Sequence, residues 1–168
     1  MNAGESIFDF TVLDINQNAV NLNKYQGAVC IIVNISTKNA FCEKVLSMLA
    51  PLYKKYHNET RKDLNILMFP CFQFGTKESM EEIRTALASQ SDSNNLQIGD
   101  VFAEIEVNGS RCIELYKFLK RMKPGTCGGF ISSNFTMFVT NKNGIPIERF
   151  GPNVHPYFLE DLLAQLCD

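Results

Sequence analysis

The chain has 168 residues, of which 45% are hydrophobic and 20% are charged. This composition predicts one globular domain, spanning residues 1–168, with a core large enough to fold unaided. A formal net charge of −2 gives no overall cationic field, which argues against nucleic acid or an anionic membrane as a partner. The six cysteines are not spaced like a small disulfide scaffold or a zinc site, and we expect no metal centre.

The N-terminal residues show no secretion or membrane signal. They lack a cationic start followed by an apolar run, and the longest apolar stretches are about eight residues, too short to cross a bilayer. We therefore expect a cytoplasmic protein with reduced cysteines, no transmembrane segment and no bound cofactor.

The first half of the chain switches between strand-like and helix-like hydrophobic periods. Alternating apolar residues on both sides of the polar turn at residues 16–18 predict an opening β-hairpin. The β-branched run at residues 29–33 predicts a central strand that is buried on both faces. Apolar positions at residues 41–56 recur at helical spacing, and residues 64–71 return to a strand pattern.

The second half predicts helices at residues 78–88 and 113–122 and strands at residues 135–140 and 145–150. Asn143-Gly144 between the last two apolar runs is a strong hairpin signal, and Pro146 favours a sheet edge for the second strand. A C-terminal amphipathic helix is expected to begin at Pro156. This order of elements predicts an α/β domain with a central mixed sheet flanked by helices.

The segment at residues 32–42 carries the most chemical information. A buried strand there runs through a short loop into a helix N-terminus. Strand ends and helix N-termini gather unpaired N–H groups and positive dipole, which stabilise a thiolate or an anionic ligand. We therefore expect the functional site at this junction.

Several segments match those of a known enzyme family in order and spacing. They are Ser6-Ile7-Phe8-Asp9-Phe10, Asn23-Lys24-Tyr25-Gln26-Gly27, Phe69-Pro70-Cys71-Phe72-Gln73-Phe74-Gly75, Val107-Asn108-Gly109, Leu115-Tyr116-Lys117-Phe118-Leu119 and Asn134-Phe135-Thr136. From Ser6 to its C-terminus the chain resembles the glutathione peroxidase family. The resemblance implies a thioredoxin-like fold with an N-terminal β-hairpin extension. It also implies a compact monomer, since the long insertion that builds tetramers is absent from the sequence.

Members of this family reduce hydroperoxides with a cysteine or selenocysteine that Gln, Trp and Asn side chains assist. The resemblance places Asn39 at the nucleophile position, where an amide cannot replace a thiolate. Gln73 and Asn134 match the assisting Gln and Asn, whereas Ser133 stands at the Trp position. The resemblance therefore implies a degenerate active site.

The sequence departs from the family pattern at two further positions. Phe72 replaces the Asn that precedes the assisting Gln, and Ala88 stands where thioredoxin-dependent members carry a resolving cysteine. The usual two-cysteine cycle cannot run without that residue. By resemblance, the substrates would be a small or lipid hydroperoxide and an external thiol reductant, either glutathione or thioredoxin.

Asn39 and Cys42 each have a structural and a catalytic interpretation. We favour Asn39 as the N-cap of the helix that begins near Phe41. The alternative makes Cys42 a relocated nucleophile, at the third helical position, where the helix dipole lowers a thiol pKa. Gln73 and Asn134 would then assist that thiolate. The competing interpretation of Cys42 is a cysteine facing the core.

Other candidate groups are interpreted as structural. We favour Cys71 as a core residue and Cys127 as an exposed bystander, with a mobile resolving thiol as the alternative for Cys127. A basic cluster at the end of the third helix consists of Lys117, Lys120, Arg121 and Lys123. We favour compensation of the helix dipole for this cluster, and the alternative is a docking patch for anionic lipid headgroups or glutathione carboxylates.

These observations leave three functional hypotheses open. The first is a catalytically impaired family member that retains the fold for binding or regulation. The second is an active thiol peroxidase that uses Cys42 and an external thiol. The third is a non-enzymatic protein whose groove binds an extended peptide. An Asn39→Cys substitution is expected to create peroxidase activity only if the remaining pocket is intact.

Overall fold

The central sheet is built from the predicted apolar runs. The computed structural model describes residues 5–89, 97–126 and 128–168. The strands of the sheet, in chain order, are β3 (Val29–Ile35), β4 (Leu64–Pro70), β5 (Asp100–Val101), β6 (Met137–Thr140) and β7 (Pro146–Phe150). They lie in the order β5-β4-β3-β6-β7. Strands β3, β4 and β5 are parallel to one another, β6 is antiparallel to β3, and β7 is antiparallel to β6. The predicted mixed sheet with a central strand at residues 29–33 is confirmed.

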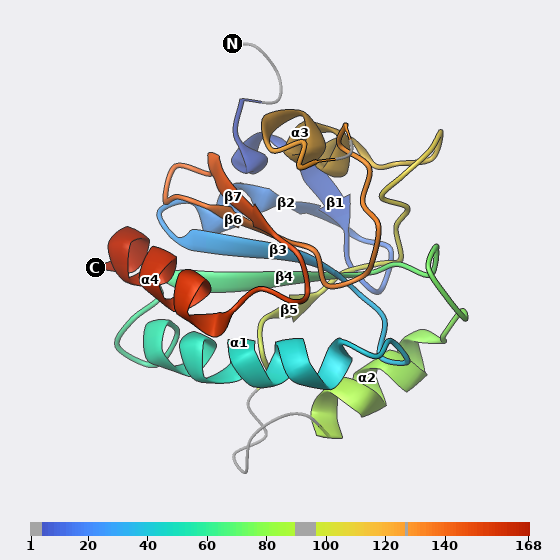
Figure 1. Ribbon diagram of the computed structural model, residues 1–168, viewed down its shortest axis with the longest axis horizontal. Coiled ribbons are helices and arrows are strands. Elements are labelled where there is room, and N and C mark those ends of the chain that lie inside the picture. The colour runs from blue at the N-terminus through green and yellow to red at the C-terminus, as the bar shows by residue number, and fades with distance from the viewer. Residues whose placement is uncertain (1–4, 90–96, 127) are drawn as a thin grey trace.

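Helices cover both faces of this sheet. They are α1 (Cys42–Tyr56), α2 (Met80–Ser89), α3 (Glu114–Met122) and α4 (Pro156–Cys167). Figure 1 shows α1, α2 and α4 on one face, and α3 together with the hairpin of β1 (Thr11–Leu13) and β2 (Ala19–Asn21) on the other. Short 3-10 helices, η1 (Ile7–Asp9) and η2 (Leu22–Tyr25), flank this hairpin. The predicted hairpin extension and flanking helices are confirmed.

The buried residues of β3 divide the core into two parts. Val29, Ile31 and Val33 pack in the cluster that includes the apolar faces of α1 and α4. Cys30 and Ile32 pack in the cluster that includes α3 and the hairpin. Since successive side chains of a strand point to opposite faces, a continuous apolar run is required for a strand buried on both sides.

Two details differ from the sequence expectation. Strand β5 was not predicted, because it has only the two residues Asp100 and Val101 and shows no alternation. Helix α2 begins at Met80 rather than at Glu78. The edge position that Pro146 predicts for its strand is confirmed, since β7 is the last strand of the sheet.

Arg149 on β7 holds the irregular loop that follows α3. Its guanidinium group donates hydrogen bonds of 2.9–3.4 Å to the backbone carbonyl groups of Lys123, Pro124, Gly129 and Phe130. The acceptors stand before and after the tip of the loop, so one side chain of the sheet edge fixes both arms of it. No helix in the described parts of the chain combines the length and apolarity that a bilayer crossing requires.

Candidate functional site

The loop at residues 36–41, here called the Asn39 loop, joins the end of β3 to the start of α1. It makes two consecutive turns, in which the Asn39 N–H donates to the Ser36 carbonyl (3.2 Å) and the Cys42 N–H donates to the Asn39 carbonyl (3.1 Å). The Asn39 side-chain oxygen accepts a hydrogen bond from the Phe41 N–H at 2.8 Å. Asn and Asp favour such loops because their side chains can bond to the backbone two residues on.

The prediction that Asn39 is the helix N-cap is therefore wrong in detail. The residue at the N-cap is Phe41, which has no side-chain acceptor, and Asn39 lies two residues before it. An additional turn separates the two positions, so that the Asn39 oxygen binds an N–H that precedes the helix. It still satisfies a backbone donor, as a cap does.

Cys42 is the first residue of α1, not the third as the spacing suggested. Its side chain is buried. Burial, together with the negative charges of Glu78 and Glu43, raises the pKa of the Cys42 thiol to about 11. Since the thiolate is the nucleophile, this environment opposes the activation that a peroxidatic cysteine needs.

A buried carboxylate lies behind the Asn39 loop. Glu78 is only 3% exposed. It accepts hydrogen bonds from the Ser36 hydroxyl and from both the N–H (3.2 Å) and the hydroxyl of Thr37. The sequence suggested only a first-turn acid for Glu78, since nothing local marks it as buried. The two hydroxyl residues at the end of β3 were the available signal, because a buried charge requires donors.

Asn134 ties the ends of two strands together. Its side-chain amide donates to the Cys71 carbonyl (3.0 Å) and accepts from the Asn34 amide (3.0 Å). The Asn34 amide also donates to the Ser133 carbonyl at 3.2 Å. The carbonyl oxygen of the Asn34 side chain is buried and has no hydrogen-bond partner among the described residues. Both hydrogen-bonding groups of the Asn134 side chain are thus engaged within the chain.

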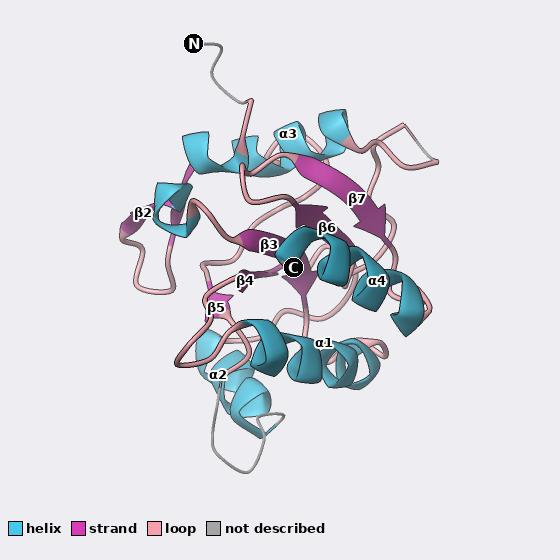
Figure 2. Cartoon of the chain, turned by 90° about the vertical axis from the view of Figure 1, so that its left-hand side faces the viewer, coloured by secondary structure: helices cyan, strands magenta, loops and turns pink. Residues whose placement is uncertain are grey.

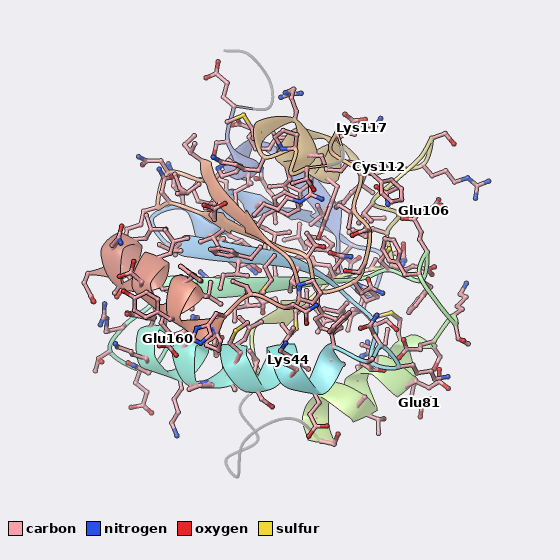
Figure 3. All side chains as sticks on the ribbon, in the orientation of Figure 1. Lys44, Glu81, Glu106, Cys112, Lys117 and Glu160 are labelled. Carbon is pink, nitrogen blue, oxygen red and sulfur yellow. The ribbon has the colours of Figure 1, made fainter. Side chains whose placement is uncertain are left out.

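Gln73 begins a chain of amide contacts, here called the Gln73 clamp, that joins three loops. Its side-chain oxygen accepts from the N–H groups of Val107 (2.6 Å) and Asn108 (3.2 Å), and its NH₂ group donates to the Asn108 carbonyl (2.9 Å). The NH₂ group also contacts Glu106, at 3.3 Å, a residue labelled in Figure 3. The Asn108 side chain in turn binds the backbone N–H (3.0 Å) and carbonyl (2.7 Å) of Ile131.

A cavity of about 280 Å³ adjoins the Asn39 loop. Its described lining consists of Ser36, Lys38, Asn39, Ala40, Phe74, Gly75, Thr76 and Asn134. The structure thus brings Asn39 and Asn134 to one cavity, whereas Gln73, Ser133 and Cys42 are not among its lining residues. The lining offers amide, hydroxyl and ammonium groups that can bind a polar ligand, and its described part holds no thiol.

The remaining candidate cysteines differ in what the structure says of them. Cys71 is fully buried, and burial raises the pKa of its thiol. Its sulfur lies 3.6 Å from the Gln73 side-chain oxygen. This environment fits the structural interpretation of Cys71. Cys127 lies outside the described residues.

The basic cluster makes contacts within the chain. Lys117 forms an ion pair with Glu114 at 2.9 Å, and the Lys120 ammonium donates to the Val107 carbonyl at 2.5 Å. The Arg121 guanidinium lies over an aromatic ring of the same helix. Figure 3 shows Lys117 on the same side of the sheet as Cys112 and Glu106, whereas Glu81 marks α2 on the other side. Among the described residues, no group of three or more His, Cys, Asp or Glu side chains is placed to hold a metal ion.

Comparison with known proteins gives a consistent result. The family model described as "Glutathione peroxidase" matches residues 7–120. A glutathione peroxidase of Schistosoma mansoni is 37% identical over 163 residues, covering 97% of this chain and 94% of the relative. A Nicotiana sylvestris relative, named "Probable phospholipid hydroperoxide glutathione peroxidase", is 37% identical over 164 residues and covers 96% and 93%.

Solved structures show the same likeness. The crystal structure of Trgpx in its apo form superposes with a TM-score of 0.77 at 30% identity, covering 96% of this chain and 95% of that one. A thioredoxin-like protein from Aeropyrum pernix superposes with a TM-score of 0.65 at 12% identity, covering 93% and 88%. The second likeness shows the thioredoxin-like fold, as the sequence predicts.

Proposed function

Because the chain belongs to the glutathione peroxidase family, we propose that it is a member that binds ligands at the family's site without turning them over. The family reduces hydroperoxides with thiol reductants, so the ligand classes to consider are a small or lipid hydroperoxide and a thiol such as glutathione. A relative carries phospholipid hydroperoxide in its name, which makes a lipid hydroperoxide a candidate ligand here.

The observation that carries this proposal is the arrangement around Asn39. Asn39, which the resemblance places at the nucleophile position, carries an amide whose oxygen binds the Phe41 N–H. The nearest thiol in sequence, Cys42, is buried, and its pKa is raised to about 11. Peroxide reduction needs a thiolate that attacks the peroxide oxygen, and neither residue supplies one near neutral pH.

The remaining polar groups support binding rather than turnover. The cavity beside Asn39 contains Lys38 and Thr76, which can hydrogen-bond to a peroxide, a hydroxyl or a carboxylate. Gln73 and Asn134, the two assisting residues that the sequence retains, hold backbone groups in place. Their presence therefore does not require a catalytic role.

The test is the oxidation of the reduced protein by stoichiometric hydrogen peroxide and by a lipid hydroperoxide, with the modified cysteines mapped by mass spectrometry. We expect oxidation at the rate of an unactivated thiol, spread over several cysteines. A Cys42→Ser variant should react at the same overall rate. Fast oxidation confined to Cys42, abolished in that variant, would overturn the proposal and establish a relocated nucleophile.

Two further properties belong to the proposal. We expect a monomer, because the segment at residues 122–133 is short, and light scattering coupled to size exclusion tests this directly. We expect cytoplasmic residence with reduced cysteines, which fractionation and thiol labelling in cells can test.

A further inference from the structure

A second cavity, of about 440 Å³, lies between the N-terminal hairpin, β5 and α2. Figure 2 shows β2, β5 and α2 along one side of the molecule, with β2 above β5 and α2 below it. None of its described lining residues also lines the cavity beside Asn39. Its volume is within the range of small-molecule sites, about 300–1,000 Å³.

The cavity has an apolar part. Val20 on β2, Leu87 on α2 and the neighbouring Val101 and Phe102 contribute to its lining. Phe102 is buried at 2% exposure, and Val20 and Leu87 are half-buried. Apolar surface in a cavity that stays open to solvent is surface that an apolar ligand chain can remove from water.

The charged lining residues are not equally available to a ligand. Asp100 accepts a hydrogen bond of 2.6 Å from the Tyr25 hydroxyl. Asp14 accepts two, from the N–H groups of Asn16 (2.8 Å) and Asn18 (2.9 Å). Both carboxylates thus already have donors from the chain itself.

The two cations of the lining have no such partner. Among the described residues, neither Lys24 nor Arg84 forms an ion pair or side-chain hydrogen bond; Lys24 lies over the ring of Tyr25 at 5.2 Å. Lys24 belongs to η2 and Arg84 to α2, so the two cations come from different walls of the cavity. Since Lys24 and Arg84 pair with neither Asp14 nor Asp100, both cations can contact an anionic head whose apolar chain lies on the adjoining surface.

We propose that this cavity binds a small amphipathic carboxylate, that is, an organic acid with an apolar chain. Its carboxylate contacts Arg84 and Lys24, and its chain lies against Val20, Leu87 and Phe102. The guanidinium of Arg84 suits a carboxylate because it can donate two parallel hydrogen bonds to it. This site is separate from the function proposed for Asn39, and either can fail without the other.

The first experiment titrates the ¹⁵N-labelled protein with octanoate and follows amide chemical shifts. We expect saturable shifts at Val20, Arg84 and Leu87, and none at Asn39. Two matched probes separate the contributions of head and chain: 1-octanol lacks the charge, and acetate lacks the chain. Each should bind at least about fivefold more weakly than octanoate. No saturable shift up to about 20 mM octanoate, or equal binding of 1-octanol, would overturn the proposal.

Charge-removing variants provide the second test. Arg84→Gln and Lys24→Gln should each raise the octanoate dissociation constant about fivefold and leave 1-octanol binding unchanged. Arg111→Gln is the matched control, because Arg111 is an exposed arginine that does not line this cavity. Both lining positions are exposed, so the variants should fold, and the amide spectrum verifies this. Equal dissociation constants for the wild type and both lining variants would contradict the proposed contacts.

Discussion

Two neighbouring loops, at the carboxyl ends of β3 and β4, satisfy their polar groups in different ways. The Asn39 loop follows β3 and the loop of Gln73 follows β4, and the ends of these parallel strands are adjacent, with Ile35 opposite Pro70. At the Asn39 loop, the buried carboxylate of Glu78 accepts hydrogen bonds from the loop, and a cavity adjoins the same loop. In the Gln73 clamp, neutral amides pair with the backbone groups of neighbouring loops.

The contacts in both loops show that the type of a polar residue does not by itself determine its role. The resemblance places Gln73 and Asn134 at positions that assist catalysis in the family, yet in this chain their side chains bind the backbone of neighbouring loops. Asn39, which the resemblance places at the nucleophile position, also binds the backbone. Under the proposed function, these polar side chains therefore serve the scaffold rather than catalysis.

The largest expected effect concerns the buried carboxylate. A Glu78→Ala substitution leaves the donors of Ser36 and Thr37 without their acceptor, and we expect it to lower the free energy of unfolding by about 3 kcal/mol. Urea unfolding measures this. Glu160→Ala is the control, since Glu160 is exposed and forms no ion pair or side-chain hydrogen bond among the described residues; it should cost less than about 0.5 kcal/mol. An equal loss of unfolding free energy in both variants would contradict the role of Glu78 as the buried acceptor for the Asn39 loop.

The second effect is a loss of stability at alkaline pH. The pKa of the Cys42 thiol is about 11 in the folded chain against 9.0 for an ordinary thiol, so the unfolded chain releases its proton first. The contribution of Cys42 is therefore complete below pH 9 and is lost as the pH rises to about 11, by about 2 kcal/mol. Cys30, with a pKa of about 12, and Cys167, with a pKa of about 11, act in the same direction.

Urea unfolding under reducing conditions, at pH values from 8 to 10.5, measures that loss. A Cys42→Ala variant should show a shallower decline than the wild type, because only its remaining thiols titrate. An identical decline in the two proteins would mean that Cys42 ionises as easily when folded as when unfolded, which would restore it as a candidate nucleophile.

The third effect concerns the Gln73 clamp. We expect Gln73→Ala to lower the free energy of unfolding by about 1.5 kcal/mol, less than Glu78→Ala, because Gln73 is exposed and water can replace part of its contacts. Amide exchange at Val107 and Asn108 should become faster. Gln165→Ala, which removes a surface contact with Asp161, is the control and should change neither quantity. Protection of Val107 that survives the loss of Gln73 would show that the clamp does not hold this loop.

The smallest expected effect is on activity. Asn39→Cys places a thiol where the resemblance puts the nucleophile, but the resemblance also puts Ser133 at the Trp position, and Gln73 is not among the described residues that line the adjoining cavity. We expect the second-order rate with hydrogen peroxide to stay within about tenfold of an unactivated thiol, as stopped-flow kinetics can measure. The matched variant Asn39→Ser shows the rate of the native cysteines alone. A thousandfold gain would mean that the rest of the site is intact.

The sequence predicts the fold well, because the fold depends on hydrophobic periodicity. The buried run at residues 29–33 and the helical pattern at residues 41–56 reappear as β3 and α1. Strand β5 escaped prediction because its two residues are too few to show an alternation. Short edge strands depend on what lies next to them, and local sequence does not contain that information.

The candidate site was harder to predict. Sequence spacing located the Asn39 loop, but the additional turn that moves Asn39 away from the N-cap depends on backbone geometry. The positive end of α1 predicted a lowered pKa for Cys42, whereas burial and two nearby carboxylates raise it. The burial of Glu78 arises from contacts across 41 and 42 residues of sequence. Each of these outcomes depends on packing between distant segments.

The contacts of Arg149 have a consequence for the integrity of the chain. Its guanidinium binds carbonyl groups on both arms of the loop after α3, so the arms are joined through the sheet edge as well as through the backbone. A protease that cuts once within this loop would leave two polypeptides that still share a sheet and this arginine. The nicked protein should therefore migrate as one particle under native conditions and separate into two fragments only when denatured.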